Sequence, residues 1–312
     1  MNSKLKHKMK TEAQEILKKA EYDVSEEINL YPKVFDYVAK KDDVRILLKT
    51  LLDINNIRKS LAQRLVEMSR LLLATPFLIG KKNKGTEMEQ GVIYERHGIK
   101  SMAPKTLRDI LIEGVPPLVY AAPGGRYANI NSKKLREERK KNNLSRGELA
   151  LRLGVSRSTI RKYEDGKDIS VEKAVKLEEI LDAPLFESLD LSYSEQNEFN
   201  KTKREINNPI LLLLSSIGFD VSPTKKAPFK ALSEAETNKF LTGIEEYNKR
   251  LKKKATVISN VSGVVDYKSF MVIKEKEKSN KSKIKDTPLL TEEEVERRDC
   301  LDEILTLIKE RA

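Results

Sequence analysis

The chain has very little of the chemistry that marks secreted or redox-active proteins. Its 312 residues include one cysteine, no tryptophan and two histidines. A single thiol cannot form an internal disulfide framework, and it suits a reducing cytoplasm. A catalytic thiol needs a neighbouring histidine, and only His7 and His97 are available. We therefore place Cys300 on the apolar side of a C-terminal helix and assign it no catalytic role.

Long hydrophobic runs are also missing. The longest, residues 210–214, falls far short of the roughly 18 apolar residues that a membrane-spanning helix needs. The lysines near the N-terminus are not followed by the apolar segment of a signal peptide. We therefore expect a cytoplasmic protein with no membrane partner.

Positive charge is plentiful and unevenly distributed. Sixty Lys and Arg residues outnumber 48 Asp and Glu residues, which gives a net charge of +12. Residues 133–162 hold eleven basic and three acidic residues, whereas residues 163–182 hold three basic and seven acidic ones. A concentrated basic segment favours a polyanionic partner. Charge alone does not identify that partner as nucleic acid, because lysine-rich composition is common.

The most informative segment covers residues 144–166, which predict two short helices, 146–153 and 157–164, joined by a turn at Gly154. Ser145 and Ser156 are placed to cap the two helix N-termini, and Glu148 completes a capping box with Ser145. The expected apolar contacts between the helices come from Leu149, Ala150, Leu153, Val155 and Ile160. This pattern is typical of a helix-turn-helix.

The outward face of the second helix carries the candidate DNA-binding side chains, which are Arg157, Ser158, Arg161 and Lys162. The alternative is a helical hairpin buried in a larger domain. A buried hairpin would not carry four cationic or hydroxyl side chains on one face, because such side chains are mostly exposed. The two-helix pattern therefore favours a recognition helix that enters the major groove of double-stranded DNA.

Residues 132–188 resemble the helix-turn-helix domain of the Cro/C1 type. The Ser-x-x-x-Ile pattern followed by Tyr-Glu-x-Gly carries the resemblance, and the five-helix plan fits residues 135–141, 146–153, 157–164, 171–181 and 185–189. The resemblance implies that base edges are contacted by Arg157, Ser158 and Lys162. It implies phosphate contacts for Arg146, Thr159, Arg161 and Lys167, although Arg146 stands where this class usually has glutamine. It also implies a bracing ion pair between Arg139 and Glu164, while Tyr163 packs.

The flanking regions predict two α/β domains with the same order of elements. Residues 11–131 are expected to form helix, three strands, helix and strand, then a hairpin around Pro123-Gly124-Gly125. Residues 206–312 repeat that order, and Phe219-Asp220-Val221-Ser222 echoes Tyr22-Asp23-Val24-Ser25. This indicates a duplication around an all-α domain at 132–191, followed by a polar linker at 192–205.

The flanking order resembles the PD-(D/E)xK restriction-endonuclease-like core, in which two acids bind Mg²⁺ and a lysine assists the attacking water. The resemblance places Asp36 and Lys49 at the first and last positions, but Leu47 occupies the second acid position. Leucine cannot ligate a metal, and the possible rescuing acids Glu27, Asp42 and Asp43 are not fixed by spacing. The second copy has Lys230, Leu241 and Gly243 at these positions. We therefore expect degenerate nuclease-like domains with no catalytic residues, metal or cofactor.

The whole chain resembles a family of archaeal HTH-type transcriptional regulatory proteins of the Cro/C1 (XRE) class. Residues 91–98, 116–125 and 227–229 carry that resemblance. It implies a sequence-specific transcriptional regulator, not an enzyme, that binds promoter DNA as a homodimer and has room for a small-molecule effector. The alternatives are a DNA-targeted metal-dependent nuclease and a chromatin- or replication-associated factor.

Overall fold

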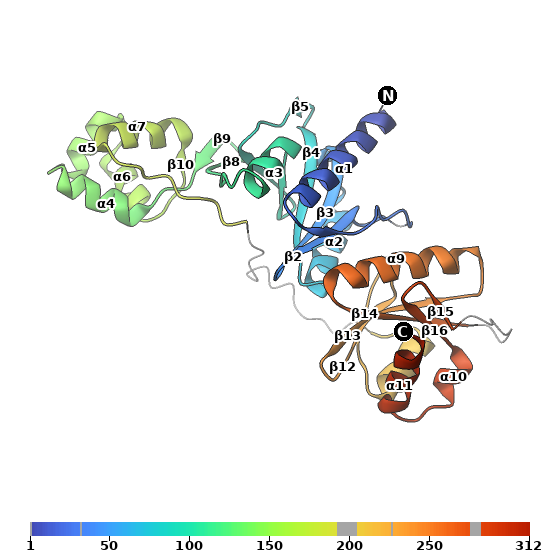
Figure 1. Cartoon of the computed structure of the whole chain (residues 1–312). Helices are drawn as coiled ribbons and strands as arrows, with labels where there is room; N and C mark the ends of the chain where they lie inside the picture. The colour runs from blue at the N-terminus through green and yellow to red at the C-terminus, as the bar shows by residue number, and fades with distance from the viewer. Residues whose placement is uncertain (1, 32, 192–204, 226, 275–281) are drawn as a thin grey trace. The chain divides into compact units, whose positions relative to one another are not determined.

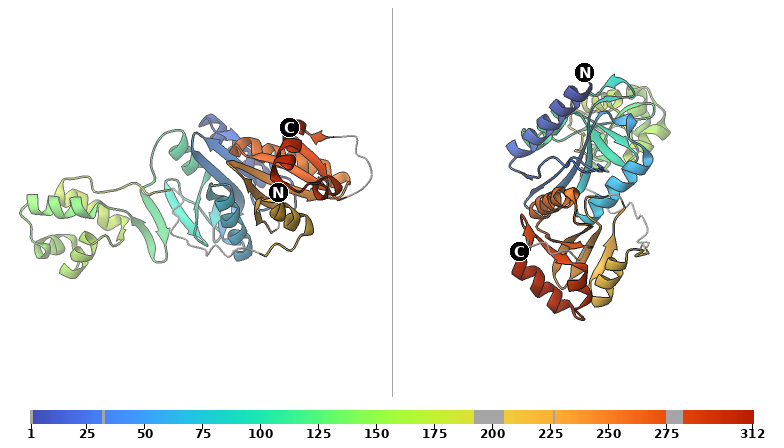
Figure 2. Two further views of the ribbon diagram at one scale, coloured as in Figure 1. Left: turned by 90° about the horizontal axis from the view of Figure 1, so that it is seen from below. Right: turned by 90° about the vertical axis from the view of Figure 1, so that its right-hand side faces the viewer.

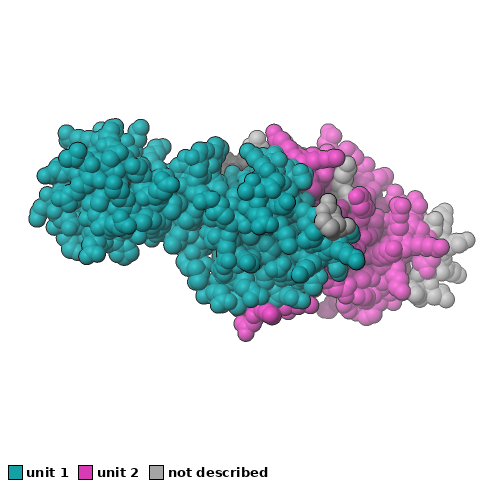
Figure 3. Space-filling model, turned by 90° about the horizontal axis from the view of Figure 1, so that it is seen from above, with its two compact units in different colours: residues 1–16, 51–57, 78–192 teal, residues 17–50, 58–77, 193–312 magenta. Residues whose placement is uncertain are grey.

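A computed structural model describes residues 2–31, 33–191, 205–225, 227–274 and 282–312. The chain divides into two compact units, coloured in Figure 3: residues 1–16, 51–57 and 78–192, and residues 17–50, 58–77 and 193–312. Both units contain parts of the expected N-terminal domain, so its boundaries at 11–131 stay a prediction. The expected linker at 192–205 lies outside the described residues except for its last position. No helix in the described ranges is long and apolar enough to cross a membrane.

The N-terminal part contains the expected alternation of helices and strands. Its helices are α1 (Asn2–Lys19), the 3-10 helix η1 (Ile54–Asn56), α2 (Lys59–Leu71) and α3 (Pro104–Leu111). Its strands are β1 (Asp23–Val24), β2 (Tyr37–Lys41), β3 (Val44–Asp53), β4 (Thr75–Asn83), β5 (Thr86–Glu87), β6 (Val92–Arg96), β7 (Ile99–Met102), β8 (Val119–Ala122) and β9 (Gly125–Ala128). The expected α/β fold class is confirmed. The hairpin predicted around Pro123-Gly124-Gly125 is the antiparallel pair β8 and β9.

The strands join one sheet in the order β1-β2-β3-β4-β7-β6-β8-β9-β10, with β5 beside β4. The last strand, β10 (Ile169–Ser170), comes from the helix-turn-helix region and pairs antiparallel with β9. β3 is buried continuously over residues 46–50, which comprise the apolar run Ile46–Leu48 followed by the polar residues Lys49 and Thr50. Short strands such as β7 and β10 carry too few residues for a periodic signal, and the sequence did not predict them.

Four helices form the all-α region: α4 (Ser132–Lys141), α5 (Arg146–Leu153), α6 (Arg157–Glu164) and α7 (Val171–Leu181). Figure 2 shows them as a separate cluster, joined to β9 by the pairing of β10. The five apolar residues expected between α5 and α6 all belong to or pack against one buried cluster, together with Leu135, Leu177 and Leu181. The helix-turn-helix is therefore confirmed, and α5, α6 and α7 have the predicted bounds.

The prediction of a fifth helix at residues 185–189 is wrong. This segment is extended: Phe186 forms an isolated bridge with Ile130, and the amide of Leu189 donates to the carbonyl oxygen of Pro117. Pro184 disfavours helical backbone at Ala183, so α7 cannot continue into this segment. The carboxylate of Glu178 accepts the amide of Phe186 at 3.0 Å, so this amide has a partner although the segment is not helical. The segment thus returns the chain to the β8–β9 hairpin.

The C-terminal part forms a second sheet. Its elements are α8 (Pro209–Ile217), β11 (Asp220–Pro223), β12 (Ala231–Ala235), β13 (Asn238–Glu245), α9 (Lys249–Val265), β14 (Lys268–Ile273), β15 (Lys283–Ile284), β16 (Thr287–Thr291), α10 (Glu292–Glu296) and α11 (Leu301–Arg311). The strand order is β11-β12-β13-β14-β16-β15. A core that includes Phe219, Phe240 and Phe270 packs the sheet against α8, α10 and α11. Figure 1 shows α9 on the opposite face.

The two sheets repeat one topology and one local hydrogen-bond pattern. The path β1-β2-β3-β4-β7 corresponds to β11-β12-β13-β14-β16. The amide of Asp36 donates to Leu48 O at 2.8 Å, and the amide of Lys230 donates to Thr242 O at the same distance. These bonds make Asp36 equivalent to Lys230 and Leu48 equivalent to Thr242. The next residues along β3 and β13, Lys49 and Gly243, are therefore equivalent as well. The correspondence is the one expected from a duplicated sequence.

The C-terminal helix that was expected to hold Cys300 on its apolar side is two helices, α10 and α11, and the predicted setting of Cys300 is wrong. Cys300 is exposed and precedes the first residue of α11. The Arg311 guanidinium donates to the Glu294 carboxylate at 2.9 Å. In one continuous helix these residues, 17 positions apart, would be separated by about 25 Å. The break lets α11 fold back so that this ion pair forms.

Candidate nucleic-acid interface

The recognition helix α6 begins at a well-defined cap. The Ser156 hydroxyl accepts the amide of Thr159 at 3.1 Å, and Gly154 occupies the left-handed region with a φ of 70°. Upstream, Ser145 and Glu148 form the predicted reciprocal capping box at the start of α5. These caps satisfy amide groups that have no partner within either helix. Together they fix the turn that holds α6 against α5.

The four predicted outward residues of α6 are all exposed, and Thr159 is half-buried. The Ser158 hydroxyl lies 2.7 Å from that of Ser156, and the Thr159 hydroxyl lies 2.8 Å from the same atom. Arg161 lies 3.7 Å from Asp165 in an exposed ion pair. Among the described ion pairs, none involves Arg157 or Lys162. Their charges are therefore available to a ligand, as is that of exposed Lys167, which follows the helix.

A fully buried carboxylate, that of Glu164, lies behind the recognition helix. Arg139 donates from Nε to Glu164 Oε1 at 2.6 Å, and Arg146 approaches Oε2 at 2.7 Å. Arg136 lies 3.6 Å from the same carboxylate. The structure brings the predicted pair of Arg139 and Glu164 together, and it adds two arginines that sequence reasoning did not assign to this carboxylate. The many basic residues in α4 and α5 were the sequence signal that more than one arginine could surround this carboxylate.

Arg146 was expected to contact a phosphate, and the structure gives it a second role. Its guanidinium already forms hydrogen bonds with Glu164, while a third of its side chain remains exposed. A phosphate contact from Arg146 stays a prediction, and it would have to be made by the donors that Glu164 does not use. Guanidinium has five N–H donors, so the two interactions are chemically compatible.

The carboxyl of Glu164 gives this region a defined response to acid. Burial raises its pKa, but hydrogen bonds from Arg139 and Arg146 outweigh burial and hold the pKa below its ordinary value. A lowered folded-state pKa stabilises the fold above the unfolded value near 4.3 and loses that stabilisation as pH falls through the folded value. We expect the urea midpoint of unfolding to hold down to about pH 5 and to fall below about pH 4. A Glu164→Gln variant should lack this part of the acid dependence.

The remnant of the nuclease-like site in the first sheet is a buried charge cluster. Lys49 Nζ lies 3.6 Å from Asp36 Oδ2, and Asp36 accepts the amide of Thr50 at 2.8 Å. Leu47, at the missing acid position, is fully buried. The structure thus brings Asp36 and Lys49 together as expected, with an apolar side chain at the position of the second metal ligand.

The candidate rescuing acids do not complete a metal site. Glu27 binds Lys33 at 2.7 Å, and Lys33 lies 3.3 Å from Asp36, so a lysine stands between the two acids. Asp42 and Asp43 are exposed at the β2–β3 turn, at the opposite end of β2 from Asp36. Among the described residues, no group of three or more acids, histidines or cysteines is placed to hold a metal ion. The residues present do not fit Mg²⁺.

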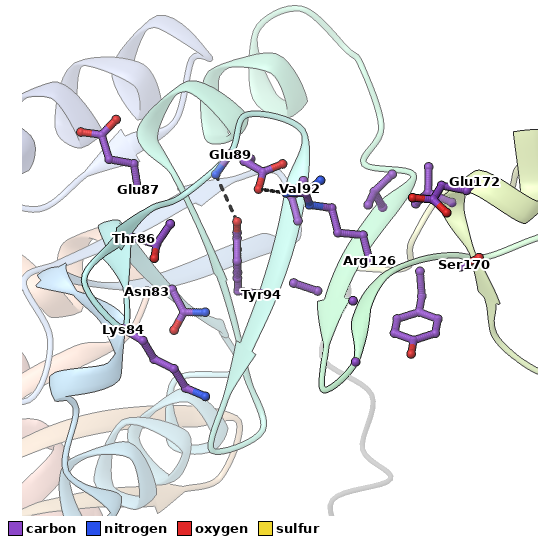
Figure 4. Close-up of a pocket in the computed structure, with 16 residues that line it drawn as sticks. Asn83, Lys84, Thr86, Glu87, Glu89, Val92, Tyr94, Arg126, Ser170 and Glu172 are labelled. Carbon is purple, nitrogen blue, oxygen red and sulfur yellow. Dashed lines mark hydrogen bonds and ion pairs between the residues drawn. The ribbon is translucent and has the colours of Figure 1, made fainter.

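A cavity of about 800 Å³ lies beside the β8–β9 hairpin. Its lining combines the segment around Lys84, strand β6, the hairpin and the first residues of α7. Figure 4 shows Arg126 paired with Glu89, whose amide donates to the Tyr94 hydroxyl at 3.1 Å. Glu172, from the helical region, lines the same cavity. A molecule bound here would touch both the sheet and α7.

The fold and the site together define a helix-turn-helix protein with a nuclease-like N-terminal domain and a second α/β domain at the C-terminus. Residues 6–117 match the model of the PD-(D/E)XK superfamily domain, and residues 135–188 match a helix-turn-helix model. No solved structure matches the chain. The second sheet, at the C-terminus, completes the expected arrangement of α/β domains around the helices.

Several archaeal proteins resemble the chain over nearly its full length. A protein of Natronomonas pharaonis is 39% identical over 95% of this chain and 96% of its own length. Proteins of Methanococcoides burtonii and Archaeoglobus fulgidus are 37% and 33% identical, over 96% and 95% of this chain and 95% and 96% of their own lengths. Each is named "Putative HTH-type transcriptional regulatory protein". The chain belongs to this family.

Proposed function

We propose that the chain is a sequence-specific transcriptional regulator that binds double-stranded DNA through α6. The observation that carries this proposal is the exposed face of the capped helix α6. It presents Arg157 and Lys162, neither of which forms an ion pair with another described residue. Arginine recognises guanine O6 and N7 in the major groove, and each good pair contributes about 1–3 kcal/mol of discrimination. The relatives' names as transcriptional regulators support the same conclusion.

The regulatory role, as distinct from DNA binding alone, is tested by mapping the protein's occupancy across its own genome. A regulator occupies promoters at sites that share one motif, and deletion of its gene changes transcription of the adjacent genes. A chromatin- or replication-associated factor instead occupies the genome broadly or gathers at replication origins. Broad occupancy without a motif would contradict the proposal. Arg157→Ala is the matched variant, because it should remove occupancy at the motif sites selectively.

We also propose that the protein is not a nuclease, despite its PD-(D/E)XK superfamily domain. The buried Leu47 and the interposed Lys33 support this proposal. We expect no cleavage of supercoiled DNA in 10 mM Mg²⁺ or Mn²⁺ above that of an Asp36→Asn preparation. The same variant should be destabilised by about 3–5 kcal/mol, because the buried ammonium of Lys49 loses its carboxylate. Metal-dependent cleavage that Asp36→Asn abolishes, with the fold retained, would show the opposite.

The protein is further proposed to act as a homodimer. Helix-turn-helix domains commonly bind two half-sites about one DNA turn apart, so a palindromic operator requires a two-fold dimer. Sedimentation of the complex with operator DNA measures the stoichiometry directly, and two chains per operator are expected.

The cavity beside Tyr94 and Arg126 is the proposed place for a small-molecule effector, because its lining includes Glu172 of α7.

A further inference from the structure

The C-terminal sheet carries a basic surface where the first sheet has its acid–lysine pair. Lys230 takes the place of Asp36, and Gly243 takes the place of Lys49, as the shared hydrogen bonds show. A Cβ at Gly243 would lie 2.6 Å from Met271 Cγ, so no lysine fits there. The second copy has therefore lost the carboxylate and gained a positive charge at the same position.

A small cavity of about 250 Å³ lies at this position. Its lining includes Thr224, Lys230, Gly243 and Lys254. Lys230 is exposed and takes part in none of the ion pairs found in the described part of the chain. Lys254 is half-buried and paired with Glu245, whose carboxyl is held below its ordinary pKa by Lys254 despite the opposing effect of burial. The cavity thus offers one uncommitted ammonium and one shared ammonium, whereas the Thr224 hydroxyl already donates to the carbonyl oxygen of Phe229.

Helix α9 extends this positive charge next to the cavity. Five of its first six residues are basic, and four of these, Lys249, Arg250, Lys252 and Lys253, are exposed and take part in no ion pair within the described ranges. The C-terminal half of α9 differs, because Asn260 accepts the amide of Glu26 at 2.7 Å and Asp266 pairs with Lys40. The far end of the helix is therefore occupied by intramolecular contacts, and the basic end is open to solvent.

The charges on α9 are locally unfavourable in the free protein. Like charges three or four residues apart repel one another on a helix. Cations in the first turn also oppose the helix dipole. A polyanion that lies across this surface removes both penalties, whereas a small neutral ligand removes neither. The chain also carries a helix-turn-helix, which favours duplex DNA as this polyanion.

We propose that the start of α9 and Lys230, here called the α9 basic surface, form a second, sequence-independent contact with the phosphate backbone of duplex DNA. The inference rests on the proposed function, because it assigns a further contact to the same DNA-binding protein. Phosphate contacts add affinity without reading sequence. The α9 basic surface would therefore raise affinity for operator and random DNA alike.

The test uses the full chain and the salt dependence of binding. Four substitutions, Lys249→Gln, Arg250→Gln, Lys252→Gln and Lys253→Gln, remove the exposed charges of α9. A matched control removes four scattered exposed lysines by Lys18→Gln, Lys59→Gln, Lys105→Gln and Lys309→Gln. Fluorescence anisotropy with a 30-base-pair random duplex gives the slope of log affinity against log salt, which changes by about 0.9 for each phosphate contact.

We expect the α9 variant to lose about 2–4 in the magnitude of that slope, whereas the control changes it by less than about 1. The single Lys230→Gln change should lower it by about 1, and the thermal midpoint of the α9 variant should be unchanged or higher because charge repulsion is relieved. Equal slopes in the α9 variant and the control would overturn the inference. If the unmodified protein binds no duplex, the proposed function fails as well. If Arg157→Ala weakens operator binding but the α9 variant and the control have equal slopes, only the inference about the α9 basic surface is contradicted.

Discussion

Glu164→Gln is expected to lower the free energy of unfolding of the helical region by about 3–5 kcal/mol. Glutamine keeps the size of the side chain but removes the negative charge that Arg139 and Arg146 surround. Arg139 is only 8% exposed, so its guanidinium would be left buried without a carboxylate. The cost arises from this uncompensated charge more than from the lost contacts. Urea unfolding followed by circular dichroism, with hydrogen exchange of the α5 and α6 amides, measures the loss.

The matched control is Asp165→Asn. Asp165 also faces two arginines, Arg136 and Arg161, but its side chain is half exposed and the distances are 3.5 and 3.7 Å. Exposed ion pairs contribute about 0–1 kcal/mol, so this variant should remain within 1 kcal/mol of the unmodified protein. Similar losses in both variants would show that burial of Glu164 does not determine its contribution.

Arg157→Ala is expected to weaken operator binding by roughly 5- to 150-fold, which corresponds to about 1–3 kcal/mol. The arginine lies in the first turn of α6, exposed and unpaired within the described residues, so its removal should not disturb the fold. Binding to random duplex should weaken by less than about threefold, since a single cationic contact is lost. The ratio of the two affinities, measured at one salt concentration, is the informative quantity.

Arg152→Ala provides the control for charge. Arg152 is exposed on α5, and its substitution removes the same single positive charge without altering α6. We expect it to reduce the affinities for operator and random DNA to a similar, small extent. If Arg157→Ala reduced both affinities by the same factor, Arg157 would contact phosphate and not a base.

The helix-turn-helix was predictable because its determinants are local. Ser145, Glu148, Gly154 and Ser156 specify caps and a turn through neighbours within a few residues, and the structure shows each in that role. The nuclease-like order was also visible, since strands and helices alternate with clear apolar periodicity. The equivalence of Asp36 and Lys230 was predicted from a short echo, and the hydrogen bonds of the two sheets agree with it.

The remaining features depend on contacts between distant residues. The carboxylate of Glu178 holds the chain extended at Phe186, and the pair of Glu294 and Arg311 accompanies the break before α11. Neither interaction has a local sequence signature, so a short helix was predicted at 185–189 and one continuous helix at the C-terminus. Arg146 could likewise be placed near DNA by position, whereas its bond to Glu164, 18 residues away, became evident only in three dimensions.

Selection of bound sequences from a randomised duplex pool, at physiological salt with and without Mg²⁺, tests the central claim most directly. Two-fold recognition through α6 predicts enrichment of a palindromic motif whose half-sites lie about one helical turn apart, with the DNA intact in both conditions. The Arg157→Ala variant should lose preference at one symmetric position of that motif. Recovery of an unenriched pool would contradict sequence-specific recognition, and loss of the pool only in Mg²⁺ would contradict the assignment as a regulator without nuclease activity.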